Sequence, residues 1–171
     1  MIRFGNSSDI EKIVSIYEDA KKLFSDLGYF QWKGNYPNID NAINDINNNK
    51  VLVTEIDNDI VCTLTLCFSV DHNYDVIDGS WLNDNQYVSI HRNCTNHKYY
   101  HKGYMTKLFI EAEKVAKDNN IYDIKIDTHM KNIYMQKMLE KLGYKKCGII
   151  KLLNRPDLED DLRIAYQKHL D

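Results

Sequence analysis

The sequence predicts a single domain of the mixed α/β class, built on a central twisted sheet of six to seven strands flanked by about four helices. β-branched runs alternate with amphipathic helical segments along the chain, and 171 residues suit one domain. No linker, repeat or low-complexity tract divides the sequence. We therefore treat residues 1–171 as one domain with the order β α α β β β α β α β β.

The first half of the chain alternates between helical and strand-like periodicity. Apolar residues recur at helical spacing from Ile10 to Phe24, after a run of capping residues and before Gly28, which ends the helix. Asn58-Asp59 lies between two β-branched runs and predicts a hairpin turn. The predicted elements are a strand over 2–5, helices from 10 to 28 and over 39–47, strands over 51–56 and 60–68, and a polar loop over 71–85.

The second half contains the unit that decides the topology. Residues 104–118 have helical periodicity and lie between strands predicted over 87–95 and 122–128. Such a strand–helix–strand unit requires parallel pairing and a right-handed crossover. The remaining predicted elements are a helix over 132–142, closed by Gly143, and strands over 144–152 and 162–168.

Composition and charge exclude several classes of protein. The net charge of -3 and the pI of about 6.1 lack the bulk positive charge that is typical of nucleic-acid binders. No apolar run approaches the roughly 18 residues of a membrane span, and the N-terminus lacks the apolar core of a signal peptide. Cys62, Cys67, Cys94 and Cys147 form no CxxC pair, so we expect reduced thiols and no metal site. We expect a cytoplasmic protein without a nucleic-acid or membrane partner.

A basic turn that contains glycine precedes the helix at 104–118. Lys98, His101 and Lys102 carry its positive charge, and Gly103 lets the backbone approach a ligand closely. Unpaired N–H groups and the positive dipole end of a helix bind phosphate readily. The turn is therefore either a phosphate site or an ordinary solvated helix start, and its residues alone leave both open.

The strand at 87–95 carries polar residues on one face. Period two places Tyr87, Ser89, His91 and Asn93 on the same side. This is unusual in a central strand, because buried polar groups need partners. An imidazole in that place either takes a proton from an amine near neutral pH or forms a hydrogen bond within the core. His91 is the candidate base, with Ser89 beside it.

Two further groups of residues are predicted to border the same region. Asp127 and His129 follow the next strand, and ligands gather outside the carboxyl ends of parallel strands. We expect His129 to face this zone as a second candidate base, whereas Asp127 either binds a substrate or caps the following helix. The aromatic segment with Gln31, Trp32 and Tyr36 either walls a pocket or is a loop anchored by its Trp.

In this combination the sequence resembles the GNAT family of N-acetyltransferases, and a bacterial subgroup of that family more closely. The resemblance covers nearly the whole chain in the same order. It rests on Gln31-Trp32…Tyr36-Pro37, Tyr74…Ile77-Asp78-Gly79…Trp81-Leu82, Ile90-His91-Arg92, Ile126-Asp127-Thr128-His129, Asn132…Met135-Gln136, Lys141-x-Gly143-Tyr144, Cys147-Gly148-Ile149-Ile150 and Arg163-x-Ala165-Tyr166.

The resemblance implies a cytoplasmic enzyme that uses acetyl-CoA as co-substrate and transfers the acetyl group directly to an amine, without a metal. The arm of the cofactor would pair with the strand near 93–95, and its pyrophosphate would lie on N–H groups at 101–106. The residues implied in cofactor binding are Asn93, Cys94, Thr95, His101, Lys102, Gly103, Tyr104, Met105, Thr106 and Asn132. Those implied around the acceptor are Gln31, Trp32, Tyr36, Trp81 and Asp127.

Three positions depart from the family pattern. Tyr100 and Met105 stand where the phosphate loop of the family has Gln or Arg and a small residue, and Leu139 stands where a Tyr usually protonates the thiolate. Two alternatives therefore remain: a GNAT fold that binds an acyl-CoA, or nothing, without catalysis, and an interaction protein. The acceptor, a small amine or a peptide amine, and the oligomeric state, monomer or homodimer, stay open.

Overall fold

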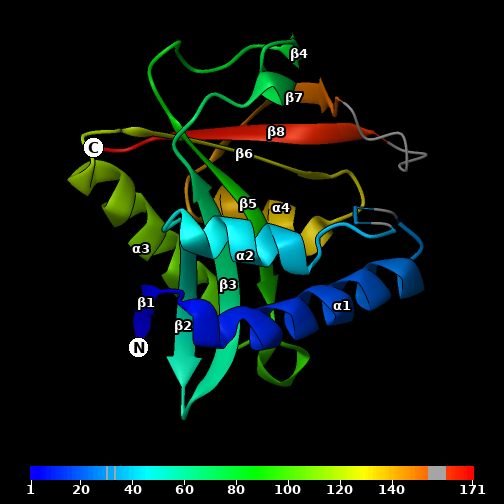
Figure 1. The fold of residues 1–171 in the computed structure, drawn as a ribbon. Helices are drawn as coiled ribbons and strands as arrows, with labels where there is room; N and C mark the ends of the chain where they lie inside the picture. The colour runs from blue at the N-terminus through cyan, green and yellow to red at the C-terminus, as the bar shows by residue number, and fades with distance from the viewer. Residues whose placement is uncertain (30, 33, 154–160) are drawn as a thin grey trace.

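The computed structural model describes residues 1–29, 31–32, 34–153 and 161–171. Within these residues one eight-stranded sheet runs through the protein, with its strands in the order β1-β2-β3-β5-β6-β8-β7-β4 (Figure 1). The helices and strands are β1 (Ile2–Phe4), α1 (Ile10–Asp26), α2 (Ile39–Asn47), β2 (Val51–Ile56), β3 (Asp59–Cys67), β4 (Ile77–Gly79), β5 (Val88–Thr95), α3 (Tyr104–Asp118), β6 (Asp123–His129), α4 (Ile133–Lys141), β7 (Lys145–Lys151) and β8 (Leu162–His169).

Helices cover both faces of the sheet. In Figure 1, α1 and α2 lie in front of the sheet, and α3 and α4 lie behind it. The apolar stripe of α1 buries Ile13 and Tyr17 in the front core, whereas Phe109 of α3 and Leu139 of α4 belong to the rear core. The helical periodicity of the sequence is therefore confirmed by burial. None of the helices in the described part of the chain has the length and apolar character needed to span a bilayer.

The prediction of six to seven strands missed β4, which lies inside the segment predicted as a polar loop. β4 pairs with β7 in an antiparallel ladder that ends at Gly79 and Gly148. A Cβ atom added to Gly79 would lie 2.2 Å from the carbonyl oxygen of Cys147, so this close pairing requires glycine. A segment of three residues is too short to show periodicity in the sequence, so β4 can be recognised only by its pairing with β7.

The hairpin turn between β2 and β3 lies one residue earlier than predicted. Asp57 and Asn58, rather than Asn58 and Asp59, adopt positive φ angles of 50° and 63°. Two consecutive residues with positive φ are typical of the tight turns that match the twist of a hairpin, and Asp and Asn tolerate this conformation best after glycine.

A β-bulge in β5 positions the functional region. Thr65 of β3 pairs with His91, whereas Thr63 pairs with Cys94, so β5 holds one extra residue. Arg92 lies in the bulge with a φ of 47°. A bulge bends its strand and interrupts the alternation of side chains, so the period-two expectation fails after His91.

Parallel pairing between β5 and β6 is short. It joins Val88 to Ile124 and Ser89 to Lys125. Beyond Ser89 the two strands diverge, as Figure 1 shows. The backbone of β5 from the bulge onward therefore pairs with β3 on one side and faces the opening between β5 and β6 on the other.

Candidate functional site

Two cavities meet at this opening. The first, which we call the His91 cavity, has a volume of about 470 Å³ and is bordered by residues of β5, of the 31–37 segment and of the segment that follows β3. The second, the Gly103 cavity, has a volume of about 500 Å³ and lies between α1, β5, α3 and α4. Asn93 borders both cavities. A ligand in one cavity can therefore reach a ligand in the other beside the bulge of β5.

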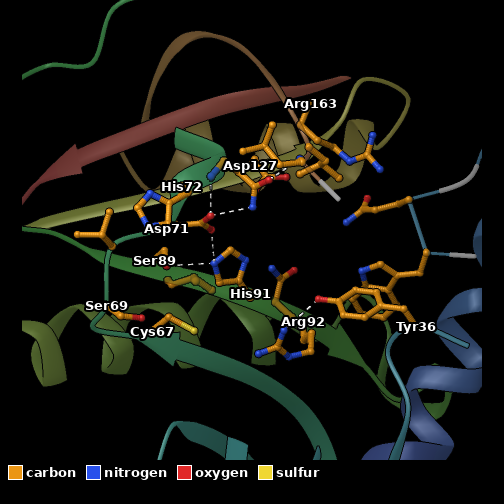
Figure 2. A pocket seen from close by; sticks show the side chains of 18 residues that line it. Tyr36, Cys67, Ser69, Asp71, His72, Ser89, His91, Arg92, Asp127 and Arg163 are labelled. Atoms are coloured by element: carbon orange, nitrogen blue, oxygen red, sulfur yellow. Dashed lines mark hydrogen bonds and ion pairs between the residues drawn. The ribbon is translucent and has the colours of Figure 1, made fainter. Parts of the chain in front are cut away.

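His91 has two partners on a single ring nitrogen. Its Nε2 lies 3.0 Å from Oγ of Ser89 and 3.0 Å from Oδ2 of Asp71 (Figure 2). Ser89 is fully buried, whereas His91 is partly exposed to the cavity. Burial alone would raise the pKa of the Asp71 carboxyl, but hydrogen bonds from His91 and Asn73 outweigh it and hold that pKa below its usual value. Asp71 is therefore a carboxylate at neutral pH.

Asp127 also borders the His91 cavity. The Tyr74 hydroxyl donates a hydrogen bond of 2.9 Å to Oδ2 of Asp127, and burial raises the pKa of the Asp127 carboxyl. Asp127 does not cap α4, because the Asn132 side chain accepts the N–H of Met135 in that role. The capping alternative for Asp127 is therefore wrong.

The aromatic segment serves as cavity wall and as anchor at once. Gln31, Trp32 and Tyr36 all border the His91 cavity. The Trp32 ring is also 8% exposed and packs edge-on against Tyr17, with ring centres 5.8 Å apart. Oε1 of Gln31 accepts a hydrogen bond of 2.8 Å from Nδ2 of Asn132, which ties this segment to the start of α4.

Two of the predicted residues lie outside both cavities. The His129 ring is buried and stacks on Tyr29 with ring centres 5.0 Å apart, and its Nδ1 accepts the N–H of Lys131 at 3.0 Å. Trp81 donates from Nε1 to the carbonyl oxygen of Tyr74 at 3.0 Å. The Trp81 bond therefore helps to hold Tyr74 in position, and the His129 ring stabilises the turn before α4.

Several residues of the site were missed by reasoning from the sequence. Asp71 and Tyr74 come from the segment predicted as a loop, and Arg92 and Asp45 form a buried pair with Nε to Oδ2 at 2.7 Å. Arg163 of β8 also borders the His91 cavity. An Asp on the apolar face of a short helix and an Arg within a β-branched strand are the signals that could have indicated the buried pair.

The Gly103 cavity brings together all the residues implied in cofactor binding. They are Asn93, Cys94, Thr95, His101, Lys102, Gly103, Tyr104, Met105, Thr106 and Asn132. Gly103 precedes α3 with a φ of 75°, which explains the glycine, and a Cβ atom there would meet nothing within 4 Å. The N–H groups of Tyr104, Met105 and Thr106 precede the first bond of the helix, which Lys107 donates to the Gly103 carbonyl.

The residues that depart from the family pattern have definite places. Met105 borders the Gly103 cavity but also packs partly against the rear core. Tyr100 is half-buried beside the cavity, and burial raises the pKa of its hydroxyl. Leu139 is fully buried in the rear core, whereas Tyr134 is largely exposed and borders the Gly103 cavity.

The Gly103 cavity suits a long ligand with an anionic end. Its walls include apolar side chains of α1 and α4, and the α3 end offers backbone N–H groups beside His101 and Lys102. At the other end of the cavity, the backbone of Asn93 to Thr95 does not pair with β6, so that edge of β5 is open to a ligand.

In the ranges that the structure describes, no group of His, Cys, Asp or Glu is arranged to hold a metal ion.

Comparisons with known proteins agree with this architecture. A model of the acetyltransferase (GNAT) family matches residues 12–144. A GNAT-family acetyltransferase from Streptococcus agalactiae has a similar structure, with a TM-score of 0.87 and 30% sequence identity over 100% of this chain and 95% of that chain. No curated protein sequence matches the chain significantly.

Two more distant structures share the fold. The yncA protein of Salmonella typhimurium, solved with its cofactor acetyl-CoA, has a TM-score of 0.74 at 16% identity and covers 100% of this chain and 94% of its own. A paia N-acetyltransferase from Thermoplasma acidophilum, in complex with coenzyme A, has a TM-score of 0.65 at 18% identity over 99% of this chain and 98% of its own. By its sequence and its structure, this chain belongs to the acetyltransferase (GNAT) family.

Proposed function

We propose that this protein is an N-acetyltransferase that transfers the acetyl group of acetyl-CoA to a primary amine by direct attack. The observation that carries this proposal is the meeting of two cavities at Asn93, on the part of β5 that no longer pairs with β6. The amine enters the His91 cavity, and the cofactor occupies the Gly103 cavity. Structures of the same fold from other organisms contain acetyl-CoA or coenzyme A, which supports this assignment.

The residues present fit the cofactor at both of its ends. The open backbone of Asn93 to Thr95 would bind the amide-containing arm as an added strand does. The N–H groups of Tyr104, Met105 and Thr106 would bind the pyrophosphate, and His101 and Lys102 would add positive charge. Asn132 would contribute by ordering the start of α4, because its side chain already holds the Met135 N–H and Gln31.

The reaction that this arrangement supports is a single acyl transfer. The amine nitrogen attacks the thioester carbonyl carbon, the C–N bond forms, the C–S bond breaks, and the thiolate leaves and takes a proton from water. His91 accepts the proton that the amine nitrogen loses. Backbone N–H groups of β5 stabilise the carbonyl oxygen as charge develops on it. Holding both substrates beside Asn93 supplies much of the rate.

The His91 cavity favours an acceptor with a positive charge. Asp71 is a carboxylate at neutral pH, and Asp127 borders the same cavity and accepts a hydrogen bond from the Tyr74 hydroxyl. A carboxylate in a partly buried site attracts an ammonium group and orients it toward the neighbouring base. We therefore propose a cationic primary amine as acceptor, bounded by Gln31 and Tyr36 on the opposite wall.

A specific observation supports a second candidate, a GNAT fold that binds the cofactor without catalysis. Tyr100 borders the Gly103 cavity where the family has Gln or Arg, and Met105 borders it where the family has a small residue. Release of free coenzyme A from acetyl-CoA, measured with a panel of primary amines, tests the two candidates. Release that depends on an amine supports the transferase. Tight binding of acetyl-CoA with no release across the panel supports the second candidate.

A further inference from the structure

We propose that Asp71 is a positioning residue that holds His91 in the tautomer with its proton on Nε2, so that Nδ1 is the nitrogen that accepts a proton from a ligand in the His91 cavity. The kinetic consequence of this tautomer rests on the proposed function, whereas the tautomer itself does not.

The contacts of the His91 ring determine which of its nitrogens carries the proton. Oδ2 of Asp71 lies 3.0 Å from Nε2, and an ionised carboxylate can only accept a hydrogen bond. Nε2 must therefore donate, and in the neutral ring Nδ1 is then the unprotonated nitrogen. Among the described residues, no hydrogen bond to Nδ1 of His91 is present, and the residue borders the cavity.

Ser89 has a supporting place in this arrangement. Its Oγ lies 3.0 Å from the same Nε2 that faces Asp71. In a proton relay through an imidazole, the two partners occupy opposite ring nitrogens. Since Ser89 and Asp71 share one nitrogen, Ser89 does not relay a proton from the cavity to His91, and it serves as a second contact that fixes the orientation of the ring.

The Asp71 carboxylate is itself held in place, with a separate task for each oxygen. Oδ1 accepts the backbone N–H of Asn73 at 3.0 Å and its side-chain Nδ2 at 2.7 Å. The backbone N–H of Asp71 donates to the Tyr87 hydroxyl at 3.1 Å. Oδ2 therefore remains for His91, and the capping bond that orders the turn does not compete with it.

The segment that carries Asp71 is fastened to the sheet by a buried cation. Nζ of Lys125 lies 4.2 Å from the centre of the Trp81 ring and 4.2 Å from that of Tyr87. Lys125 is 5% exposed and belongs to β6, so its ammonium group is a clamp that holds both rings against the sheet. The backbone N–H of Asp71 donates to the Tyr87 hydroxyl, and the indole N–H of Trp81 donates to the carbonyl oxygen of Tyr74. By holding both rings, the clamp therefore fixes the position of the Asp71 carboxylate.

Other charged and titratable groups also surround the His91 ring. Tyr74 stacks on it with ring centres 6.3 Å apart, and Asp127 interacts with it electrostatically. Among the described residues, the charged and titratable groups that face His91 or border the same cavity are Tyr36, Cys67, Asp71, His72, Tyr74, Arg92, Asp127 and Arg163. Asp71 is the one among them with a direct contact to the ring nitrogen, so its replacement is the informative change.

Substitution of Asp71 by Asn separates a positioning role from a purely structural one. Asn is as good a cap as Asp, so its Oδ1 keeps the Asn73 N–H and the turn stays ordered. The amide nitrogen then takes the place of Oδ2 and donates to Nε2, which reverses the tautomer of His91. We expect long-range ¹H–¹⁵N spectra to show the Nε2–H form of His91 in the wild type and the Nδ1–H form in D71N.

The kinetic readout follows from the same change. In D71N, kcat with an amine acceptor should fall at least about tenfold, as expected when a base holds its proton on the wrong nitrogen, while the affinity for acetyl-CoA stays within twofold. D78N is the matched control, because Asp78 is exposed in the same segment and borders neither cavity. D78N should retain both the wild-type tautomer and the wild-type kcat.

Two results would overturn the inference: a wild-type spectrum with His91 as the Nδ1–H form, or an unchanged tautomer in D71N. The wild-type spectrum can be recorded without any variant, so it remains decisive even if the D71N protein fails to fold. If no amine is acetylated by the wild type while the spectra show the expected reversal, the proposed function fails and the role of Asp71 in fixing the tautomer stands.

Discussion

Arg92 and Asp45 form a buried ion pair that joins the bulge of β5 to α2, with Nε of Arg92 2.7 Å from Oδ2 of Asp45. Nη1 of the same guanidinium donates to the Tyr36 hydroxyl at 2.9 Å. One side chain thus connects the strand that bears His91 to the segment that forms the opposite wall of the cavity. The position of the wall relative to the candidate base depends on this link.

Removing the cation should destabilise the fold. Arg92→Met leaves Asp45 buried without a counter-charge, which costs about 3–5 kcal/mol of unfolding free energy. At roughly 2–4 °C per kcal/mol for a chain of this size, thermal unfolding should shift down by about 6 °C or more. Lys21→Met is the control, because its pair with the exposed Glu18 contributes under about 1 kcal/mol. Equal shifts for the two variants would show that the buried pair does not stabilise the fold.

The proposed base should act on the rate and not on cofactor binding. His91→Ala should lower kcat near pH 7 by roughly 10²-fold, because a general base contributes about 10²–10⁴. The dissociation constant for acetyl-CoA, measured by titration, should remain unchanged. His97→Ala is the matched control, since His97 pairs with Asp19 on the surface and borders neither cavity. A wild-type kcat in His91→Ala would make His91 a structural residue.

Met105 should not be the obstacle to the cofactor that the family pattern suggests. Its side chain packs partly against the rear core, and the space beside Gly103 is open. Met105→Gly should therefore leave the affinity for acetyl-CoA within about twofold, while the loss of packing and the glycine in the helix lower the unfolding free energy by at least about 1 kcal/mol. Calorimetric titration and thermal unfolding measure the two effects. A tenfold gain in affinity would show that Met105 crowds the site.

The two carboxyls of the His91 cavity should have opposite effects on stability. The folded-state pKa of Asp127 lies above the usual 3.8, so the folded protein disfavours the carboxylate at neutral pH. Asp127→Asn should raise the midpoint of thermal unfolding at pH 7, because it keeps an oxygen that accepts from Tyr74. This gain should shrink as the pH falls through the folded-state pKa of Asp127 and vanish near the unfolded value.

The Asp71 carboxyl should have the opposite effect on stability at neutral pH. Its folded-state pKa lies below the usual 3.8, so its contribution to stability is present above that value and is lost as the pH falls through the folded-state pKa. Asp71→Asn should lower the midpoint at pH 7 and converge on the wild type in acid. Thermal scans of both variants between pH 3 and pH 7 provide the comparison. A shift of the same sign for the two variants at pH 7 would contradict the assigned directions.

The sequence predicted the elements with regular periodicity and missed those that depend on a distant partner. The apolar spacing of α1 and α3 placed both helices to within a few residues of their observed bounds. Three-residue β4 carries no period of its own and forms because Gly79 and Gly148 allow close pairing. The bulge at Arg92 was also invisible, since only the register against β3 reveals it.

The same distinction holds for the site. His91 and Ser89 could be predicted as neighbours, because residues two apart on a strand share a face. Asp71 could not, because it reaches His91 from a segment 20 residues earlier, through a turn, a hydrogen bond to Tyr87 and the clamp of Lys125. His129 was expected to face the cavity beside His91, but its ring packs on Tyr29.

Thermal unfolding with and without acetyl-CoA tests the central claim most directly. At a ligand concentration near 100 times the dissociation constant, binding adds about 2.7 kcal/mol to the unfolding free energy, which corresponds to roughly 5–10 °C for a domain of this size. We expect a shift of this order with acetyl-CoA and with coenzyme A. No shift with either ligand would mean that the Gly103 cavity does not hold the cofactor, and it would contradict the assignment of this protein as an N-acetyltransferase.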